Sequence, residues 1–273
     1  MATHGSAFPI AKLALNNNVP PILMASLRMG MVMLLLIPFW KFKIPDKKYL
    51  KSLILFSISM GVMVYVFMNL SLKHSSFISP IIIGAQLAVP FAVLLSAQMI
   101  GENISFKKWI YVILAFVGII IVFFDPELKN NLLGLFFASL MALFFAVAQV
   151  YSRQLKELSL TMLNAYTGFF GFLVLIVVSF FVEGEVIINI KNINFESWIL
   201  ISYQAVIVSL FAHMSMFYLY KFYTVGQIFP FYSLFPIFGI ILTFFIFGEI
   251  PSLLFFIGSF IVISSVILLQ KTK

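Results

Sequence analysis

The sequence lacks the residues and motifs on which most enzyme sites depend. It has no cysteine, which excludes a disulfide framework, a thiolate metal site and a cysteine nucleophile. Its three histidines, His4, His74 and His213, do not have metal-ligand spacing. It also has no glycine-rich phosphate loop and no nucleophile–base pair. We therefore expect no enzyme activity, no metal and no cofactor.

Charge is scarce, and apolar residues dominate. Only 10% of the 273 residues are charged and 63% are hydrophobic, whereas average proteins are roughly half apolar and a quarter charged. Solid apolar runs of about 20 residues predict membrane-spanning helices, and strands of a β-barrel would instead alternate polar and apolar residues. The sequence thus predicts an all-α membrane protein. Loop lysines at one membrane face account for the net charge of +8, so we expect no nucleic-acid partner.

One unit occurs twice, about half a chain apart. Residues 101–124 and 248–270 each begin with a Gly-Glu turn, continue through polar or helix-breaking residues and end in an apolar run. Such recurrence indicates an internal duplication. We predict two five-helix repeats, residues 1–124 with spans 1–5 and residues 132–270 with spans 6–10.

Ten spans are predicted in all. Residues 1–15 rise only about 22 Å as a helix, so the first span is expected to be truncated. The other nine are Ile22–Trp40, Ser52–Leu72, Ser76–Ile100, Trp109–Phe124, Leu132–Ser152, Thr161–Val182, Trp198–Tyr220, Gly226–Phe247 and Leu253–Leu269.

Loop charges orient these spans. Ten spans place both termini on one side, and most loop lysines and arginines fall on that side. The other side has only Lys73, Lys129 and Lys191, so both termini are predicted to be cytoplasmic. Five spans separate the two Gly-Glu turns, so the repeats must be inverted relative to each other. Inverted repeats are typical of secondary transporters, whose substrate site lies near the midplane between the repeats.

The acidic residues all lie in loops or at span ends. Glu102 and Glu249 each precede a helix, where a carboxylate caps free N–H groups and meets the positive end of the helix dipole. We therefore interpret both as structural. Because no visible span has a carboxylate at mid-membrane, the pattern disfavours proton-coupled export of drug cations.

Two cations lie inside apolar spans. Lys12 and Arg28 would each cost several kcal/mol if left unpaired in the membrane. Either they snorkel to the outer surface, or they face a cavity and bind a carboxylate or phosphate. The sequence alone leaves both possibilities open.

Polar residues form stripes on three spans. At helical spacing they are Ser57, Gly61, Tyr65 and Asn69 on the third span, Ser139, Ala142, Ala146, Gln149 and Arg153 on the sixth, and Ser202, Ser209, His213 and Tyr220 on the eighth. For His213 a structural hydrogen bond and a place in a cavity both remain open. Gln86 lies four residues before Pro90, which should leave the Gln86 carbonyl unsatisfied and able to hold a substrate ammonium. The candidate substrate-binding residues are Lys12, Arg28, Tyr65, Asn69, Gln86, Gln149, His213 and Tyr232.

Short motifs in both halves resemble one known family. They are Gly5 with Phe8 and Lys12, Pro20-Pro21 followed by Leu27-Arg28-Met29, Gln86 with Pro90, and Pro236 followed by Gly248-Glu249. With these motifs in this order, the chain resembles the EamA-type transporters of the drug/metabolite transporter superfamily. His4 stands where the family usually has tryptophan. The resemblance implies solute transport by alternating access, with export of amino acids or related metabolites as in the family members that it resembles most.

The expected function is therefore secondary transport of a small polar metabolite. The favoured form of it is export of an amino acid or amino-acid derivative. We expect a multi-pass protein of the bacterial inner membrane whose partners are a small-molecule substrate and the lipid bilayer, as a monomer or homodimer. The alternatives are a broad-specificity drug or cofactor carrier and a non-transporting membrane scaffold.

Overall fold

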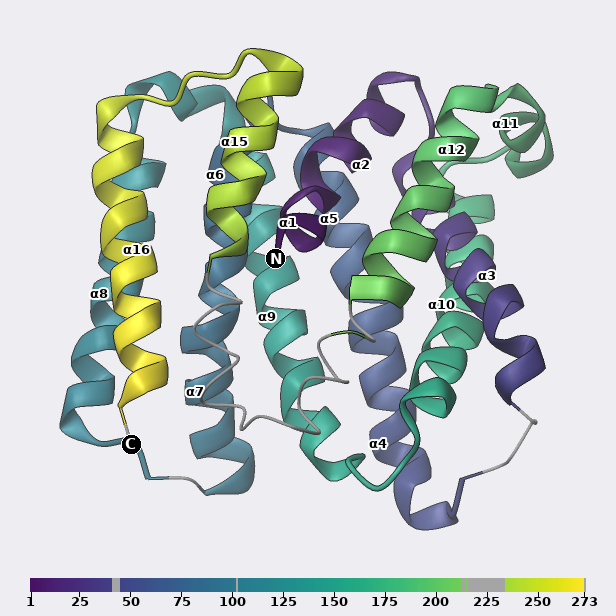
Figure 1. Ribbon diagram of the computed structural model, residues 1–273, viewed down its shortest axis with the longest axis horizontal. Coiled ribbons are helices and arrows are strands. Elements are labelled where there is room, and N and C mark those ends of the chain that lie inside the picture. Colours follow the sequence, from purple (N-terminus) through teal and green to yellow (C-terminus); the bar gives the residue numbers. More distant parts are fainter. Residues whose placement is uncertain (41–44, 102, 213–214, 216–233, 273) are drawn as a thin grey trace.

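A computed structural model describes the whole chain except residues 41–44, 102, 213–214, 216–233 and 273, and the described part is helical (Figure 1). The first half contains α1 (Ala2–Gly5), α2 (Ala7–Asn16), α3 (Pro21–Trp40), α4 (Lys47–Ile58), η1 (Ser59–Met63), α5 (Val64–Lys73), α6 (Ser79–Gly84), η2 (Ala85–Leu87), α7 (Ala88–Ile100) and α8 (Phe106–Phe123). The second half contains η3 (Pro126–Asn131), α9 (Leu132–Gln154), α10 (Leu160–Val182), α11 (Val186–Asn192), α12 (Phe195–Tyr203), η4 (Gln204–Ala212), α15 (Phe235–Phe247) and α16 (Leu253–Lys271).

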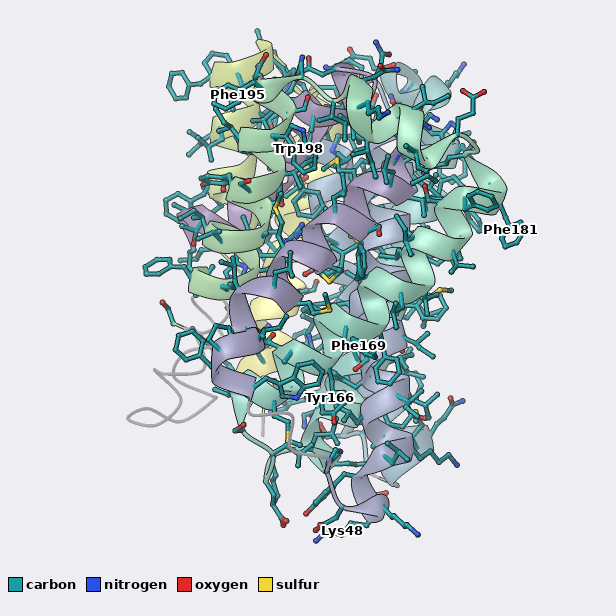
Figure 2. The ribbon with its side chains drawn as sticks, turned by 90° about the vertical axis from the view of Figure 1, so that its right-hand side faces the viewer. Lys48, Tyr166, Phe169, Phe181, Phe195 and Trp198 are labelled. Carbon is teal, nitrogen blue, oxygen red and sulfur yellow. The ribbon has the colours of Figure 1, made fainter. Side chains whose placement is uncertain are left out.

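Eight helical segments of the described part are long and apolar enough to cross a membrane. They include α4–η1–α5, α6–η2–α7 and α12–η4, which run as continuous helices through a change of helix type. The apolar helix α15 is shorter, with 13 residues, and α1 and α2 are short segments at the start of the chain. Large apolar side chains such as Phe181 and Phe195 point away from the bundle, as expected of a surface that faces lipid (Figure 2).

The loops gather at two ends of the bundle (Figure 1). We call one the basic end, because the described basic residues at the helix termini and connections there are Lys47, Lys48, Lys51, Lys107, Lys108, Arg153, Lys156 and Lys271. The other, which we call the opposite end, has Lys73, Lys129 and Lys191. Helix α7 ends at the basic end and α15 at the opposite end (Figure 1). The glycines of the two Gly-Glu motifs, Gly101 and Gly248, thus lie at opposite ends, as the odd number of spans between them predicts.

Helices from the two halves pack against each other in pairs, α3 with α10 and α8 with α16. The second pair crosses at two glycines. A Cβ on Gly118 would lie 2.9 Å from the Gly258 carbonyl oxygen, and a Cβ on Gly258 would lie 2.7 Å from that of Gly118. Only glycine permits this backbone approach, which is a common device of helix packing in membranes.

Three spans leave regular α-helical geometry in their interiors. Segments η1 and η4 are π-helical and η2 is a 3-10 turn. Such stretches inside helices are frequent at functional sites, because they re-aim side chains and expose backbone groups. All three border the same cavity.

Candidate functional site

A cavity of about 90 Å³ lies inside the bundle, between the interrupted spans. Segment η1 contributes Met60, η2 contributes Ala85 and Gln86, and η4 contributes Val208. The polar residues of its wall are His4, Arg28, Tyr65, Gln86 and Gln149. The rest of the wall is apolar and formed by Ala7, Phe8, Met60, Val64, Met68, Ala85, Ala88, Val89, Met141, Ala142, Phe145, Val208 and Phe235.

Arg28 is buried in this wall rather than snorkelling to the surface, so the structure decides between the two possibilities left open by the sequence. Its Nε donates to Ser209 Oγ over 2.9 Å, and its Nη1 donates to Gln204 Oε1 over 2.8 Å. The guanidinium also lies over the Tyr65 ring, 4.2 Å from its centroid. In the part of the chain that the structure describes, no carboxylate pairs with Arg28. Its charge is met by neutral groups alone.

Gln86 is the second unusual group in the wall. Its side chain is buried, and its Nε2 has no hydrogen-bond partner among the described residues. The prediction that Pro90 leaves the Gln86 carbonyl unsatisfied was wrong, because a backbone N–H at the end of η2 donates to that carbonyl. The 3-10 turn shortens the hydrogen-bond step from four residues to three and so compensates for the proline. Gln86 therefore offers the cavity a side-chain donor.

Lys12 and Asn69 are engaged elsewhere. The Lys12 ammonium donates to the carbonyls of Leu72 and Ser75 over 2.6 and 2.7 Å, at the C-terminal end of α5. Asn69 donates through Nδ2 to the Pro21 carbonyl over 2.9 Å, and neither side chain is part of the cavity wall. Tyr65 and Asn69 are both on α5, one α-helical turn apart as the stripe predicts, but Asn69 binds the first residue of α3 instead of lining the cavity.

The structure brings together Arg28, Tyr65, Gln86 and Gln149, four of the eight predicted site residues. His213 and Tyr232 lie outside the described residues. Sequence reasoning missed Gln204, although an amide inside an apolar span was a visible signal. It was passed over because α-helical spacing does not group Gln204 with Ser209.

Glu249 does cap a helix, but the helix belongs to the other half of the chain. Its two carboxylate oxygens accept from the backbone N–H groups of Ile78 and Ser79, over 2.7 and 2.8 Å, at the start of α6. Its own helix, α16, is capped by Ser252. Glu102, the matching residue of the first half, lies outside the described residues.

Glu183 repeats this arrangement, although no sequence pattern singled it out. It accepts from the N–H groups of Ile22 and Leu23 over 2.7 and 2.8 Å at the start of α3. Asn131 Oδ1 likewise binds the turn before α6 through the N–H of Ser76 and the hydroxyl of Ser75. The two halves are thus joined at the opposite end by buried and half-buried groups that satisfy helix termini.

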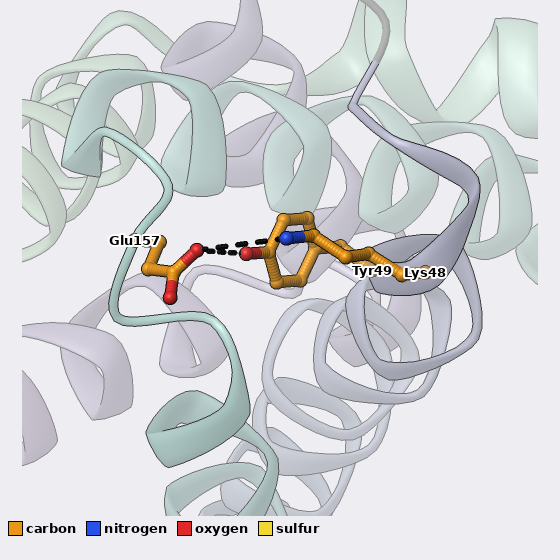
Figure 3. Close-up of polar contacts among 3 residues, drawn as sticks. All are labelled: Lys48, Tyr49 and Glu157. Atoms are coloured by element: carbon orange, nitrogen blue, oxygen red, sulfur yellow. Dashed lines mark hydrogen bonds and ion pairs between the residues drawn. The ribbon is translucent and has the colours of Figure 1, made fainter.

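The described polar contacts between the halves at the basic end are exposed, and a small cluster of buried leucines, Leu53, Leu155 and Leu163, lies beside them. The Tyr49 hydroxyl donates to the Glu157 carboxylate, and the Lys48 ammonium lies 3.8 Å from the same carboxylate (Figure 3). Ser52 Oγ donates to Gln154 Oε1 over 2.6 Å nearby. These contacts join α4 to the connection between α9 and α10.

An apolar helical bundle of two packed halves, with a buried cation in the wall of a cavity between them, defines a polytopic membrane protein. The EamA-like transporter family model matches residues 1–124 and 132–270, so the chain belongs to the EamA-like transporter family. Its members move small molecules across membranes.

Comparison with solved structures supports the fold. One described as "Crystal structure of protein" is 14% identical and aligns with a TM-score of 0.52, covering 97% of this chain and 94% of that chain. At this identity the likeness shows the fold alone. No curated protein matches the chain.

Proposed function

We propose that the protein is a ten-helix secondary transporter that exports amino acids or amino-acid derivatives by alternating access between two inverted repeats. In this proposal the basic end faces the cytoplasm of a bacterial cell, in keeping with the distribution of loop cations. The observation that carries the proposal is Arg28, a buried cation in the cavity wall without a carboxylate partner among the described residues.

An unpaired cation inside a membrane protein costs several kcal/mol. Hydrogen bonds to Gln204 and Ser209 and the face of Tyr65 offset part of this cost, but none supplies a negative charge. A substrate carboxylate would supply it, and the unpartnered Nε2 of Gln86 is a second donor for the same group. Gln149 is left to meet the substrate's amino group.

The remainder of the wall favours an apolar side chain on the substrate. Methionine and phenylalanine surround the polar groups, for example Met60, Met141 and Phe235. Methionine is flexible and polarizable, so it fits apolar groups of several shapes. We therefore expect apolar amino acids to be the preferred substrates.

Counterflow in proteoliposomes tests the proposal. The purified protein is assayed with radiolabelled leucine, methionine and phenylalanine, with the amides of these amino acids, and with nucleosides and organic cations. We expect exchange of the amino acids, and we expect Arg28→Met to weaken their apparent affinity by about 10–100-fold, the range for a buried hydrogen bond to a charged group. The matched control, Arg153→Met, removes an exposed cation at the basic end and should leave exchange unchanged.

Two other results would replace the proposal. Exchange of nucleosides or organic cations in place of amino acids would favour the broad-specificity carrier. Exchange of nothing in the panel by folded protein would favour the scaffold.

A further inference from the structure

Two side chains five residues apart in the sequence converge on one guanidinium. Gln204 and Ser209 both lie on η4, and both accept hydrogen bonds from Arg28. All three side chains are buried. Neither Gln204 nor Ser209 is part of the cavity wall, but Arg28 is.

The π-helix is what makes this convergence possible. In an α-helix of 3.6 residues per turn, residues five apart point about 140° away from each other. A π-helix bonds each residue to the one five positions on, so residues five apart lie above one another on the same face. Segment η4 therefore presents Gln204 and Ser209 to Arg28 together.

Gln204 is itself held in place. Its Nε2 donates to the Ala7 carbonyl on α2 over 2.6 Å, which leaves its Oε1 directed at Arg28. The amide thus joins α2, α3 and η4, three segments from both halves of the chain. Exchanging its oxygen and nitrogen would break both bonds at once, so the orientation is fixed by its partners.

We propose that Gln204 and Ser209 are positioning residues that hold the Arg28 guanidinium in the cavity wall, and that their neutrality reserves its charge for the substrate carboxylate. The inference rests on the proposed function and narrows it. It assigns to η4 the discrimination between amino acids, which carry a carboxylate, and their amides, which carry a neutral carboxamide in its place. A carboxylate at either position would neutralise Arg28 internally and compete with the substrate.

The central test is Gln204→Glu, which places such a carboxylate against Arg28. Binding is measured by the thermal stabilisation that L-leucine and L-leucinamide give the purified full chain, and transport by counterflow of the same two compounds. We expect the affinity for L-leucine to fall about tenfold or more, while the affinity for L-leucinamide does not fall. Gln98→Glu, the same change at an exposed position of α7, should alter neither.

Three further variants separate positioning from folding. Gln204→Leu removes both hydrogen bonds without adding charge, so L-leucine binding should fall less than in Gln204→Glu. Ser209→Ala should weaken L-leucine binding, and Ser209→Thr, which keeps the hydroxyl, should restore it.

Other outcomes separate this inference from the proposed function. Equal weakening of both compounds in Gln204→Glu, no change in that variant, or a Ser209→Thr variant that behaves like Ser209→Ala would overturn the inference. Wild-type protein that binds L-leucine without exchanging it would refute the transport proposal and leave the positioning test in force. Wild-type protein that does not bind L-leucine would refute both.

Discussion

Replacing Glu249 by glutamine should destabilise the protein without changing how transport depends on protons. The carboxylate is buried, and its two oxygens accept from Ile78 and Ser79 at the start of α6. A hydrogen bond to a charged group contributes about 1.5–3 kcal/mol, and a negative charge at a helix N-terminus adds about 0.3–1 kcal/mol. Glutamine keeps one acceptor oxygen, so the variant should lose roughly 2–4 kcal/mol.

Thermal unfolding in detergent measures this loss. For chains of 150–250 residues each kcal/mol shifts the midpoint by about 2–4 °C, so this slightly longer chain should drop by about 5–10 °C. Glu183→Gln is the matched variant, because Glu183 makes the same pair of bonds to Ile22 and Leu23, and it should show a similar drop. Glu196→Gln removes an exposed carboxylate and should leave the midpoint nearly unchanged.

The opposite result would refute the capping argument. If Glu249→Gln unfolded at the wild-type temperature yet abolished a proton-driven transport that the wild type performs, Glu249 would be a proton carrier. Loss of stability with an unchanged pH profile of the remaining transport supports the structural role.

Three further predictions follow from single contacts. Gly118→Ala should lower the free energy of unfolding by about 1–3 kcal/mol, because its Cβ would lie 2.8 Å from Val262 and 2.9 Å from a backbone oxygen. Gly84→Ala should lower it less in the same thermal unfolding assay, because its Cβ would meet only Ala138 at 3.2 Å. The Tyr49 hydroxyl and the Lys48 ammonium lower the pKa of Glu157 below its ordinary value of 4.5, so the stability that this contact adds is present above that value and is lost as the pH falls through the lowered pKa. Wild type and Glu157→Gln should therefore differ in thermal midpoint at neutral pH and converge in acid, and a constant difference would contradict the assignment. In this cysteine-free chain, an impermeant thiol reagent outside the cell should label Ile250→Cys and miss Phe106→Cys, because these exposed residues lie at opposite ends of the bundle, and equal labelling of both would refute the inverted arrangement.

The sequence was most informative where the free-energy cost of unsatisfied backbone groups in the membrane decides the structure. Solid apolar runs leave a segment such as Leu132–Gln154 only one stable form in a membrane, a helix that satisfies its own backbone. The Gly-Glu turns were also visible, because each helix ends at a glycine with a positive φ, Gly101 at 75° and Gly248 at 66°. Lysine-rich connections then indicated which ends of the spans lie together.

The site was harder to predict, because it depends on departures from regular helices. Arg28, Tyr65, Gln86 and Gln149 could be chosen as polar groups that are expensive in an apolar span, and the fold places them in one cavity wall. The π-helical segment η4 could not be anticipated from α-helical spacing, so Gln204 was overlooked. The spacing placed Asn69 one turn from Tyr65 on α5, but it could not show that the cavity wall ends between them. The choice of capping partner was equally hidden, because Glu249 and Glu183 act on helices far away in the sequence.

The two ends of the bundle differ in the polar contacts that separation of the halves would break there. At the opposite end, Glu249 and Glu183 are bound to helix termini through two N–H groups each, and separation would leave these donors and the buried Glu249 carboxylate unsatisfied. At the basic end the contacts of Glu157 are exposed, so water replaces them at little cost, and surface ion pairs contribute about 0–1 kcal/mol. Among the polar contacts of the described residues, those at the basic end are therefore the weaker set, while the buried Leu53, Leu155 and Leu163 also join the halves there. In the proposed orientation that side is the cytoplasm, from which the proposed exporter would take its carboxylate substrate, and the described polar contacts there are the exposed ones.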